Sequence, residues 1–358
     1  MTNCFFITGY VRSGTTLVEK LLCNHPSLSV LSQPLPTLYF ELKRLFLNSI
    51  DINNEYFLLS HYVGEKRYRP IDFQQYLNLA KVPAEIVDSS INSSYSGNWT
   101  SVARGELKSS LSLDMLYQHL MLANTHNPMA NMFGSKEVLC EEFVPYYLTH
   151  GIKVLHITRD PRDVVSSIKR GNGNNFIGQV KPLLFELRNW RKSAQLAIQY
   201  KNTANFMSIK YEDLVLDTDN VLKAVCNFLD IEVFPNDAFS NGILTQSGKV
   251  WSSNSSFSAV DGLVSSGSIG KYKELLSKEV LEYIAVICHP ELHDLSMQSL
   301  LDPNFSAIIK NFQEPIAVTD NNSAPDYSTN AGAIEYEIVR LHKFLDGNLQ
   351  FEFLVDKH

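Results

Sequence analysis

Short apolar runs alternate with longer amphipathic stretches along most of the chain. The run at 4–8 (Cys-Phe-Phe-Ile-Thr) is too short for a helix and is expected to form a buried strand, whereas the stretch at 15–23 places Leu17, Leu21 and Leu22 on one helical face. Similar apolar runs, each expected to form a strand, occur at 28–31, 132–137, 153–158 and 205–210. Helical spacing recurs at 35–47, 107–123, 141–149, 163–170, 183–200, 220–229 and 278–288. This alternation predicts an α/β fold in which helices flank a parallel sheet on both faces.

Other regions depart from this pattern. Residues 48–105 are rich in Asn, Ser and Tyr and lack one clear period, so short helices and loops are expected there. Residues 252–268 are expected to form a Ser/Gly-rich loop, and a loop of this length in a compact domain is expected to have a function. The tail holds in order a polar linker, an amphipathic helix and a strand-like segment, at 320–331, 333–345 and 349–355.

The length fits one large domain with an extension. We expect a single domain over 1–302, with an insertion at roughly 48–130, and a C-terminal extension over 303–358. The extension is compatible with a lid, an oligomer contact or a clamp across the core, and the sequence does not choose among them. The oligomeric state therefore stays open.

Composition and charge narrow the class of ligand. The net charge of -7 argues against broad binding to nucleic acid or to an anionic membrane, although local arginines can still hold a small polyanion. The five cysteines show no metal-ligand spacing, which favours reduced, packed thiols. No apolar run is long enough to span a bilayer, and the first strand begins too early to leave room for a signal peptide. We therefore expect a cytoplasmic protein with no membrane or nucleic-acid partner.

A loop between the first strand and the first helix carries the main chemical signal. It reads Gly-Tyr-Val-Arg-Ser-Gly-Thr-Thr over residues 9–16. Such a loop presents backbone N–H groups and the positive end of the helix dipole, which together attract an anion. Gly14 permits close backbone approach, Arg12 adds a positive charge, and Thr15 and Thr16 add hydroxyl donors. The pattern predicts a phosphate site.

The loop is a poor match to an ATP or GTP enzyme. The nucleotide-triphosphate pattern is Gly-x4-Gly-Lys-Ser/Thr, and Thr15 stands where that lysine is required. The only cation of the loop, Arg12, lies two residues before the second glycine. No Mg²⁺-binding carboxylate clearly follows an apolar strand. A phosphate-loop kinase or nucleotide-binding protein therefore remains only as an alternative.

The same loop resembles the 5′-phosphosulfate loop of sulfotransferases that use 3′-phosphoadenosine-5′-phosphosulfate (PAPS). Cytosolic members of that family usually carry Lys where Arg12 stands, and the Arg-Ser-Gly-Thr-Thr-Leu form is similar to the protein-tyrosine branch and to many bacterial members. His25 and Pro26 fit the second group. The resemblance implies a sulfotransferase fold similar to that of phosphate-loop NTPases, PAPS as co-substrate, no metal, and Ser13 among the donor-binding residues.

A second segment resembles the part of the family that binds the 3′-phosphate of PAPS. The strand at 153–158 leads into Arg-Asp-Pro-Arg-Asp-Val-Val-Ser-Ser, and the family's Arg and Ser, eight residues apart, match Arg159 and Ser167. A guanidinium at a strand end and a hydroxyl two turns into a helix suit a phosphate. Asp160 and Asp163 are candidates for orienting the arginines.

Further matches extend the resemblance over roughly residues 4–290. Tyr211, in a Tyr-Glu-Asp segment, matches a residue that lies near the adenine in the family. A late loop that closes over the 3′-phosphate is matched by Ser265, Ser266 and Gly267, where cytosolic members have Arg-Lys-Gly. Lys271 is therefore expected to supply the positive charge of this late loop.

Sulfuryl transfer needs cations at the leaving phosphate and a base for the acceptor. Arg12 and Lys136 are the candidate cations. The usual bases are absent, because Val138 stands at the histidine position of cytosolic members and Gln33 at the glutamate position of the protein-tyrosine branch. The base is expected to be Glu137, next to the former position, or alternatively His61.

Gln33 is expected to contact the acceptor. The acceptor walls should come from 33–105 and 245–265, where the family's variable loops lie. The resemblance thus implies transfer from PAPS to a hydroxyl, amine or guanidine of a small molecule, for example a saxitoxin-type alkaloid in natural-product biosynthesis. A non-catalytic protein that binds PAP (3′,5′-ADP) is the other alternative.

Overall fold

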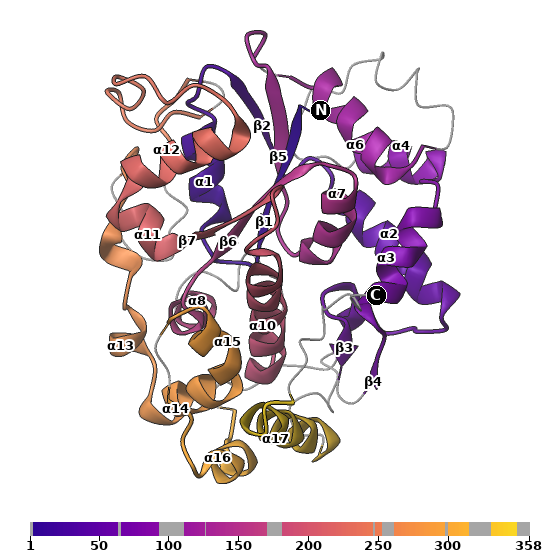
Figure 1. Cartoon of the computed structure of the whole chain (residues 1–358), viewed down its shortest axis with the longest axis vertical. Coiled ribbons are helices and arrows are strands. Elements are labelled where there is room, and N and C mark those ends of the chain that lie inside the picture. The colour runs from indigo at the N-terminus through magenta and orange to yellow at the C-terminus, as the bar shows by residue number, and fades with distance from the viewer. Residues whose placement is uncertain are drawn as a thin grey trace. The chain divides into compact units, whose positions relative to one another are not determined.

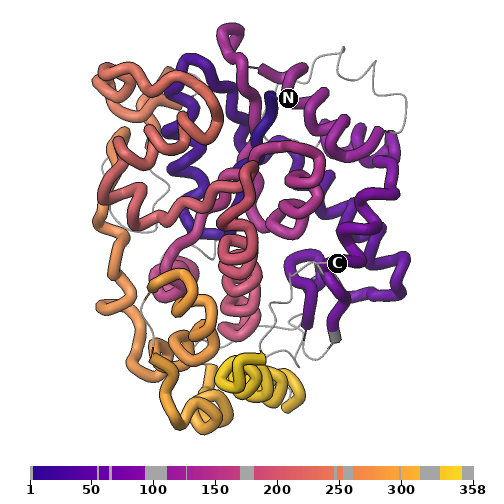
Figure 2. Tube along the Cα trace, viewed as in Figure 1, coloured from indigo at the N-terminus to yellow at the C-terminus, as the bar shows by residue number. Residues whose placement is uncertain are grey.

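In the computed structural model, the short apolar runs of the sequence form one parallel sheet (Figure 1). Its strands lie in the order β2-β5-β1-β6-β7, so that β1 is central and pairs with β5 on one side and β6 on the other. The bounds are β1 Cys4–Gly9, β2 Leu28–Ser32, β5 Met132–Lys136, β6 Lys153–Thr158 and β7 Phe206–Lys210. Figure 2 shows indigo β1 beside magenta β6, although these strands are far apart in the sequence. The expected parallel sheet is confirmed.

The structure describes residues 3–63, 66–92, 111–125, 127–169, 181–245, 248–252, 261–297, 300–314 and 331–348. They divide into two compact units, which the chain enters several times. The sheet unit comprises Met1–Asn53, Asp72–Thr158 and Lys201–Ser266. The helical unit comprises Asn54–Ile71, Arg159–Tyr200 and Gly267–His358. The strand expected at 349–355 lies outside the described residues.

Both faces of the central strand are covered in the sheet unit. All of β1 is buried, and the ring of Phe6 packs against Tyr39, Tyr117 and Tyr147 with centroids 4.8–6.0 Å apart. In Figure 1, α1 and α12 lie on one side of the sheet and α6 and α7 on the other. The helices are α1 Thr15–Leu22, α2 Pro36–Ser49, α3 Pro70–Leu79, α4 Ala84–Asn92, α6 Leu113–Ala123, α7 Val144–Thr149, α11 Tyr211–Leu216 and α12 Thr218–Leu229.

The helical unit is organised around one long helix, which has the bounds expected from the sequence, α10 Leu183–Tyr200. Its other helices are α8 Pro161–Lys169, α13 Tyr272–Leu275, α14 Lys278–Ile287, α15 His289–Asp294, α16 Phe305–Asn311 and α17 Ala331–Leu345. A two-stranded hairpin, β3 Tyr62–Val63 with β4 Lys66–Arg67, was not expected. Two-residue strands are too short to show a period-2 pattern.

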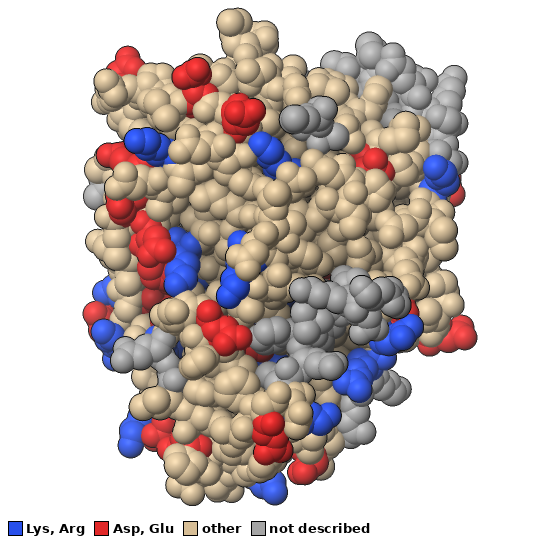
Figure 3. Space-filling model, viewed as in Figure 1, with Lys and Arg blue, Asp and Glu red and all other residues tan. Residues whose placement is uncertain are grey.

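The C-terminal extension is part of the helical unit. Its helix α17 contacts α16 and places the fully buried Glu337 against Arg188 and Arg191 of α10. No described helix is long and apolar enough to cross a membrane. On the face drawn in Figure 3, basic and acidic side chains are interspersed without a broad basic field.

Candidate functional site

The loop between β1 and α1 requires both of its glycines. A Cβ on Gly9 would lie 2.5 Å from the carbonyl oxygen of Ile157 in the neighbouring strand β6. Gly14 has φ 98°, and a Cβ there would lie 2.4 Å from Cδ2 of Tyr211. Between them, the Ser13 amide donates to the Tyr10 carbonyl at 3.1 Å and closes the turn. The tight conformation of the loop therefore follows from what its backbone touches.

Helix α1 begins directly at the end of this loop. The amides of Leu17 and Val18 donate to the Gly14 carbonyl at 3.0 and 3.3 Å, which starts the helical ladder. The amides of Thr15 and Thr16, in the first turn, have no acceptor within the helix and carry the positive end of its dipole. The arrangement suits an anion.

Arg12 lies in the middle of the loop with φ 64°, in the left-handed region that costs a non-glycine residue roughly 1 kcal/mol. Arg12, Gly14 and Thr16 are partly exposed, whereas Ser13 and Thr15 are buried. The accessible part of the loop thus includes Arg12, the Gly14 backbone and Thr16, while Ser13 and Thr15 lie in the interior.

Tyr211 brings a third motif to the loop. It follows β7 directly as the first residue of α11, and it is 8% exposed. Its ring lies against Gly14, as the distance to the hypothetical Cβ shows. The loop at 9–16 and an aromatic side chain, which were expected to bind the ligand from separate motifs, are therefore in contact within the sheet unit.

Lys136 lies at the end of β5, beside the strand that leads into the loop. It pairs in register with Ile7 of β1 and is 2% exposed. Its Nζ donates to Oε1 of Gln33 at 3.0 Å, and the Gln33 amide donates back to the Lys136 carbonyl at 2.8 Å. Burial lowers the pKa of Lys136 below its usual value. Lys136 and Gln33 are thus joined by two hydrogen bonds, one through the side chains and one through the backbone.

Glu137 follows Lys136 but its carboxyl group serves another partner. Oε1 accepts a hydrogen bond from the Leu35 amide at 2.8 Å, where α2 begins, and the residue is 1% exposed. Burial raises the pKa of Glu137 to about 8. At neutral pH the carboxyl group of Glu137 is therefore mainly protonated. It lies in the interior of the sheet unit.

Glu19 belongs to the same polar cluster, although the sequence motifs did not point to it. It is completely buried on α1, one turn after Thr15, and its Oε2 lies 3.5 Å from Nζ of Lys136. The same oxygen accepts from Oγ of Ser32 at 2.8 Å, and Oε1 lies 2.6 Å from Nζ of Lys20. The sequence signal that could have identified Glu19 was a carboxylate on the otherwise apolar, buried face of the first helix.

In the helical unit, Arg159 meets the late loop. Its Nη2 donates to the Ser268 carbonyl at 2.6 Å, its own carbonyl accepts from Nε1 of Trp190 at 2.8 Å, and it is 5% exposed. Ser167 is buried further along α8. The structure therefore joins the segment expected to bind the 3′-phosphate to the loop expected to close over it.

The two aspartates near Arg159 have separate roles. Asp163 accepts from the amides of Gly270 at 2.7 Å and Tyr272 at 3.2 Å, which fastens the late loop to α8. Asp160 accepts from Nε and Nη2 of Arg162 at 2.8 and 2.5 Å. Asp160 therefore orients Arg162, whereas Asp163 positions the backbone of the late loop and also attracts the Arg159 guanidinium. Burial raises the pKa of Asp163, and the attraction to Arg159 acts to lower it.

The remaining site candidates lie in different surroundings. Nζ of Lys271 pairs with Glu274 at 3.0 Å on α13, and Ser265, Ser266 and Gly267 precede it with partly or fully exposed side chains or backbone. His61 is 2% exposed next to the hairpin, with its ring 4.6 Å from that of Tyr62. Among the described residues, no group of His, Cys, Asp and Glu gathers as metal ligands would.

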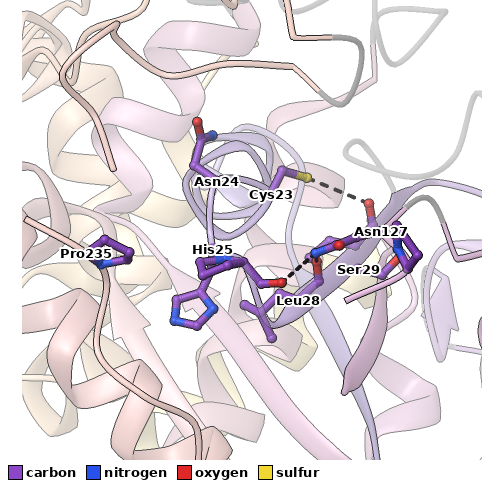
Figure 4. A pocket seen from close by; sticks show the side chains of 10 residues that line it. Cys23, Asn24, His25, Leu28, Ser29, Asn127 and Pro235 are labelled. Carbon is purple, nitrogen blue, oxygen red and sulfur yellow. Dashed lines mark hydrogen bonds between the residues drawn. The ribbon is translucent and has the colours of Figure 1, made fainter. Parts of the chain in front are cut away.

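A pocket of the sheet unit lies away from these motifs (Figure 4). It surrounds the end of α1 and the start of β2, whereas the loop follows the opposite, carboxyl end of β1. Its polar side chains bind the protein itself: His25 contacts the Glu232 carbonyl at 2.8 Å, and Asn127 donates to the carbonyls of Pro26 and Leu28. His25 is thus a structural residue of a turn.

A family model of the sulfotransferase domain matches residues 3–296. The chain belongs to the sulfotransferase family. The α/β sulfotransferase fold expected from the sequence is thereby confirmed, and the match ends before the extension. A comparison with curated proteins returned no match.

Solved sulfotransferase structures are similar to this sulfotransferase at low identity. A sulfotransferase domain from the curacin biosynthetic pathway is 17% identical, covering 83% of this chain and 98% of its own, with a TM-score of 0.47. The sulfotransferase domain of the Synechococcus PCC 7002 olefin synthase is 16% identical, covering 94% of each chain, with a TM-score of 0.36. A mouse sulfotransferase complexed with PAP is 10% identical, covering 87% and 90%, with a TM-score of 0.37.

Proposed function

We propose that this sulfotransferase moves the sulfuryl group of PAPS to a hydroxyl, or to an amine or guanidine nitrogen, of a small molecule. The observation that carries the proposal is the contact between Tyr211 and Gly14. This contact brings together a loop whose amides suit a phosphate group and an aromatic ring that can face a base. An adenine nucleotide contains both of these groups. Thr15, in place of a lysine, disfavours a nucleoside triphosphate.

The proposed transfer needs an acceptor atom, cations at the leaving phosphate and a base. The acceptor oxygen or nitrogen attacks sulfur, the bond from sulfur to the 5′-phosphate oxygen breaks, and its electron pair leaves with PAP. Arg12 and Lys136 are proposed to stabilise the charge that develops on the leaving phosphate. The acceptor's proton passes to a base, so the products are PAP and the sulfated acceptor.

The 3′-phosphate of PAPS is assigned to Arg159 and Ser167 of the helical unit. Support comes from the burial of the Arg159 guanidinium and from its bond to the Ser268 carbonyl, which fixes its direction just before α8. The late loop, with Ser265, Ser266, Gly267 and Lys271, is proposed to complete this subsite.

Glu137 and His61 are the proposed alternatives for the base. A carboxyl group whose pKa lies near the working pH can accept a proton in its ionised fraction, which favours Glu137, but reaching an acceptor would require its bond to the Leu35 amide to open. Glu137→Gln and His61→Gln separate the two. The variant of the true base should lose about 100-fold or more in kcat while PAP affinity is retained.

The acceptor is proposed to be a hydroxylated or cationic metabolite, such as a saxitoxin-type alkaloid. The acidic net charge of -7 favours a cation over an anion. Labelled sulfuryl transfer from PAPS, measured across phenols, alcohols, amines and guanidinium compounds, tests the class. We further propose a cytoplasmic enzyme, since all five cysteines are thiols outside any disulfide and four of them are buried.

Titration calorimetry separates the competing functions. Binding of PAP without binding of ATP and Mg²⁺ supports the proposal, and the reverse result overturns it in favour of a nucleotide-triphosphate protein. If PAP binds tightly but no acceptor is sulfated, the chain is a PAP-binding protein without catalysis.

A further inference from the structure

The ammonium group of Lys136 contacts two side chains. It donates to Oε1 of Gln33, 3.0 Å away, and it lies 3.5 Å from Oε2 of Glu19. Lys136 is 2% exposed and Glu19 is completely buried. Because water is excluded, these contacts decide both the direction of the ammonium and whether it keeps its proton.

A buried ammonium is unstable without a counter-charge. The charged or titratable groups that act on Lys136 are Glu19 and Lys20 of α1 and the adjacent Glu137. Glu137 is mainly protonated at neutral pH, Lys20 opposes the charge, and Gln33 is neutral. Glu19 is the carboxyl group with the largest favourable effect on the charged form of Lys136, ahead of Glu137.

The Glu19 carboxylate is itself fixed. Ser32 donates to Oε2, and Lys20 occupies Oε1. Glu19 also lies one turn along α1 from Thr15, so it ties the phosphate loop's helix to the end of β5. A shift of either element would change the direction of the Lys136 ammonium.

We propose that Glu19 is a positioning residue, which holds the Lys136 ammonium ionised and directed for its contact with the leaving phosphate. The inference rests on the proposed function, in which Lys136 stabilises that phosphate. Gln33 also contacts this ammonium but carries no charge, so the counter-charge is assigned to Glu19.

The test is the pH dependence of kcat/KM for sulfuryl transfer. Glu19→Gln should lower activity at pH 8 by about tenfold or more and move the alkaline limb to lower pH by about one unit, because Lys136 then loses its proton more easily. The double variant Glu19→Gln/Gln33→Glu returns a carboxylate to the ammonium and should move the limb back. Lys20→Met, the matched control, should leave the limb in place or raise it.

A second readout does not depend on catalysis. The titration of Lys136 is followed by NMR of isotopically labelled lysine without donor or acceptor, and Lys136→Met assigns the signal. The midpoint should fall in Glu19→Gln and recover in the double variant; an unchanged midpoint overturns the proposal even if the enzyme is a sulfotransferase. If Glu19→Gln does not fold, Glu19→Asp, with its longer gap to the ammonium, should give a smaller fall. A lowered midpoint without sulfuryl transfer in the wild type would refute the function instead.

Discussion

The ring of Tyr211 lies directly against Gly14, although one residue follows the last strand of the sheet and the other precedes the first helix. Any side chain at position 14 would enter the space of that ring. The phosphate loop and the Tyr-Glu-Asp motif are therefore one structure, and a change in either should affect the same ligand.

Gly14→Ala should weaken PAP binding by about tenfold or more, because the added Cβ displaces Tyr211 or the loop. Calorimetry with PAP measures the effect. Gly248→Ala is the matched control, since Gly248 has φ 74° and open space around the position of a Cβ. Equal PAP affinity for both variants and wild type would contradict a role of this contact in binding.

Arg159→Lys should lower the affinity for PAP by about tenfold while leaving that for AMP unchanged, since a lysine loses the planar fork that suits the 3′-phosphate. Calorimetry with both nucleotides checks this. Arg162→Lys, three residues further along, in α8, but paired with Asp160, is the control. An equal loss for both nucleotides would show that Arg159 acts on the fold and not on the 3′-phosphate.

The carboxylate of Glu337 forms salt bridges with three arginines. Arg188, Arg191 and Arg340 approach it at 2.7, 3.1 and 2.9 Å. Burial alone would raise the pKa of Glu337, but the arginines lower it to about 2, so its contribution to stability is present above the ordinary glutamate pKa and is lost as pH falls toward 2.

Glu337→Gln should therefore lower the free energy of unfolding by about 3–5 kcal/mol, as expected when one partner of a buried charge network is removed. Urea unfolding at pH 7 measures it. Glu335→Gln, on the exposed side of the same helix, should cost less than about 0.5 kcal/mol. A similar small loss at Glu337 would mean that the extension does not stabilise the helical unit.

His156 should make the protein sensitive to acid. It is completely buried in β6, and burial lowers its pKa to about 3. The unfolded chain takes up this proton near pH 6.5, so stability is full above that value and is lost as pH falls from 6.5 toward 3. Between pH 7 and 5 the loss from this residue is about 2 kcal/mol.

Urea unfolding of wild type and His156→Phe at both pH values checks this. Between pH 7 and pH 5, the free energy of unfolding of the variant should fall by about 2 kcal/mol less than that of the wild type, whatever the stability of the variant at pH 7. His293→Gln removes an exposed histidine and should keep the wild-type difference. The same acid loss in His156→Phe as in wild type would assign the sensitivity to other groups.

The sequence by itself determined the local elements and the family. Apolar periodicity located all five strands of the sheet and the bounds of α10, and the order of residue types at 9–16 distinguished the loop from a triphosphate-binding one. These features were readable because they depend on neighbours along the chain: a strand or helix has a fixed repeat, and a loop before a helix has free amides whatever surrounds it.

Only the tertiary structure decided which of these elements touch. Glu19 gains its place beside Lys136 because β5 pairs with β1 in parallel register and α1 packs on both strands. Asp163 holds the late loop through backbone amides, which leave no mark on the sequence. Likewise, Glu337 is indistinguishable from the exposed Glu335 until α17 is placed against α10. Such contacts join residues far apart in the chain, so no local pattern encodes them.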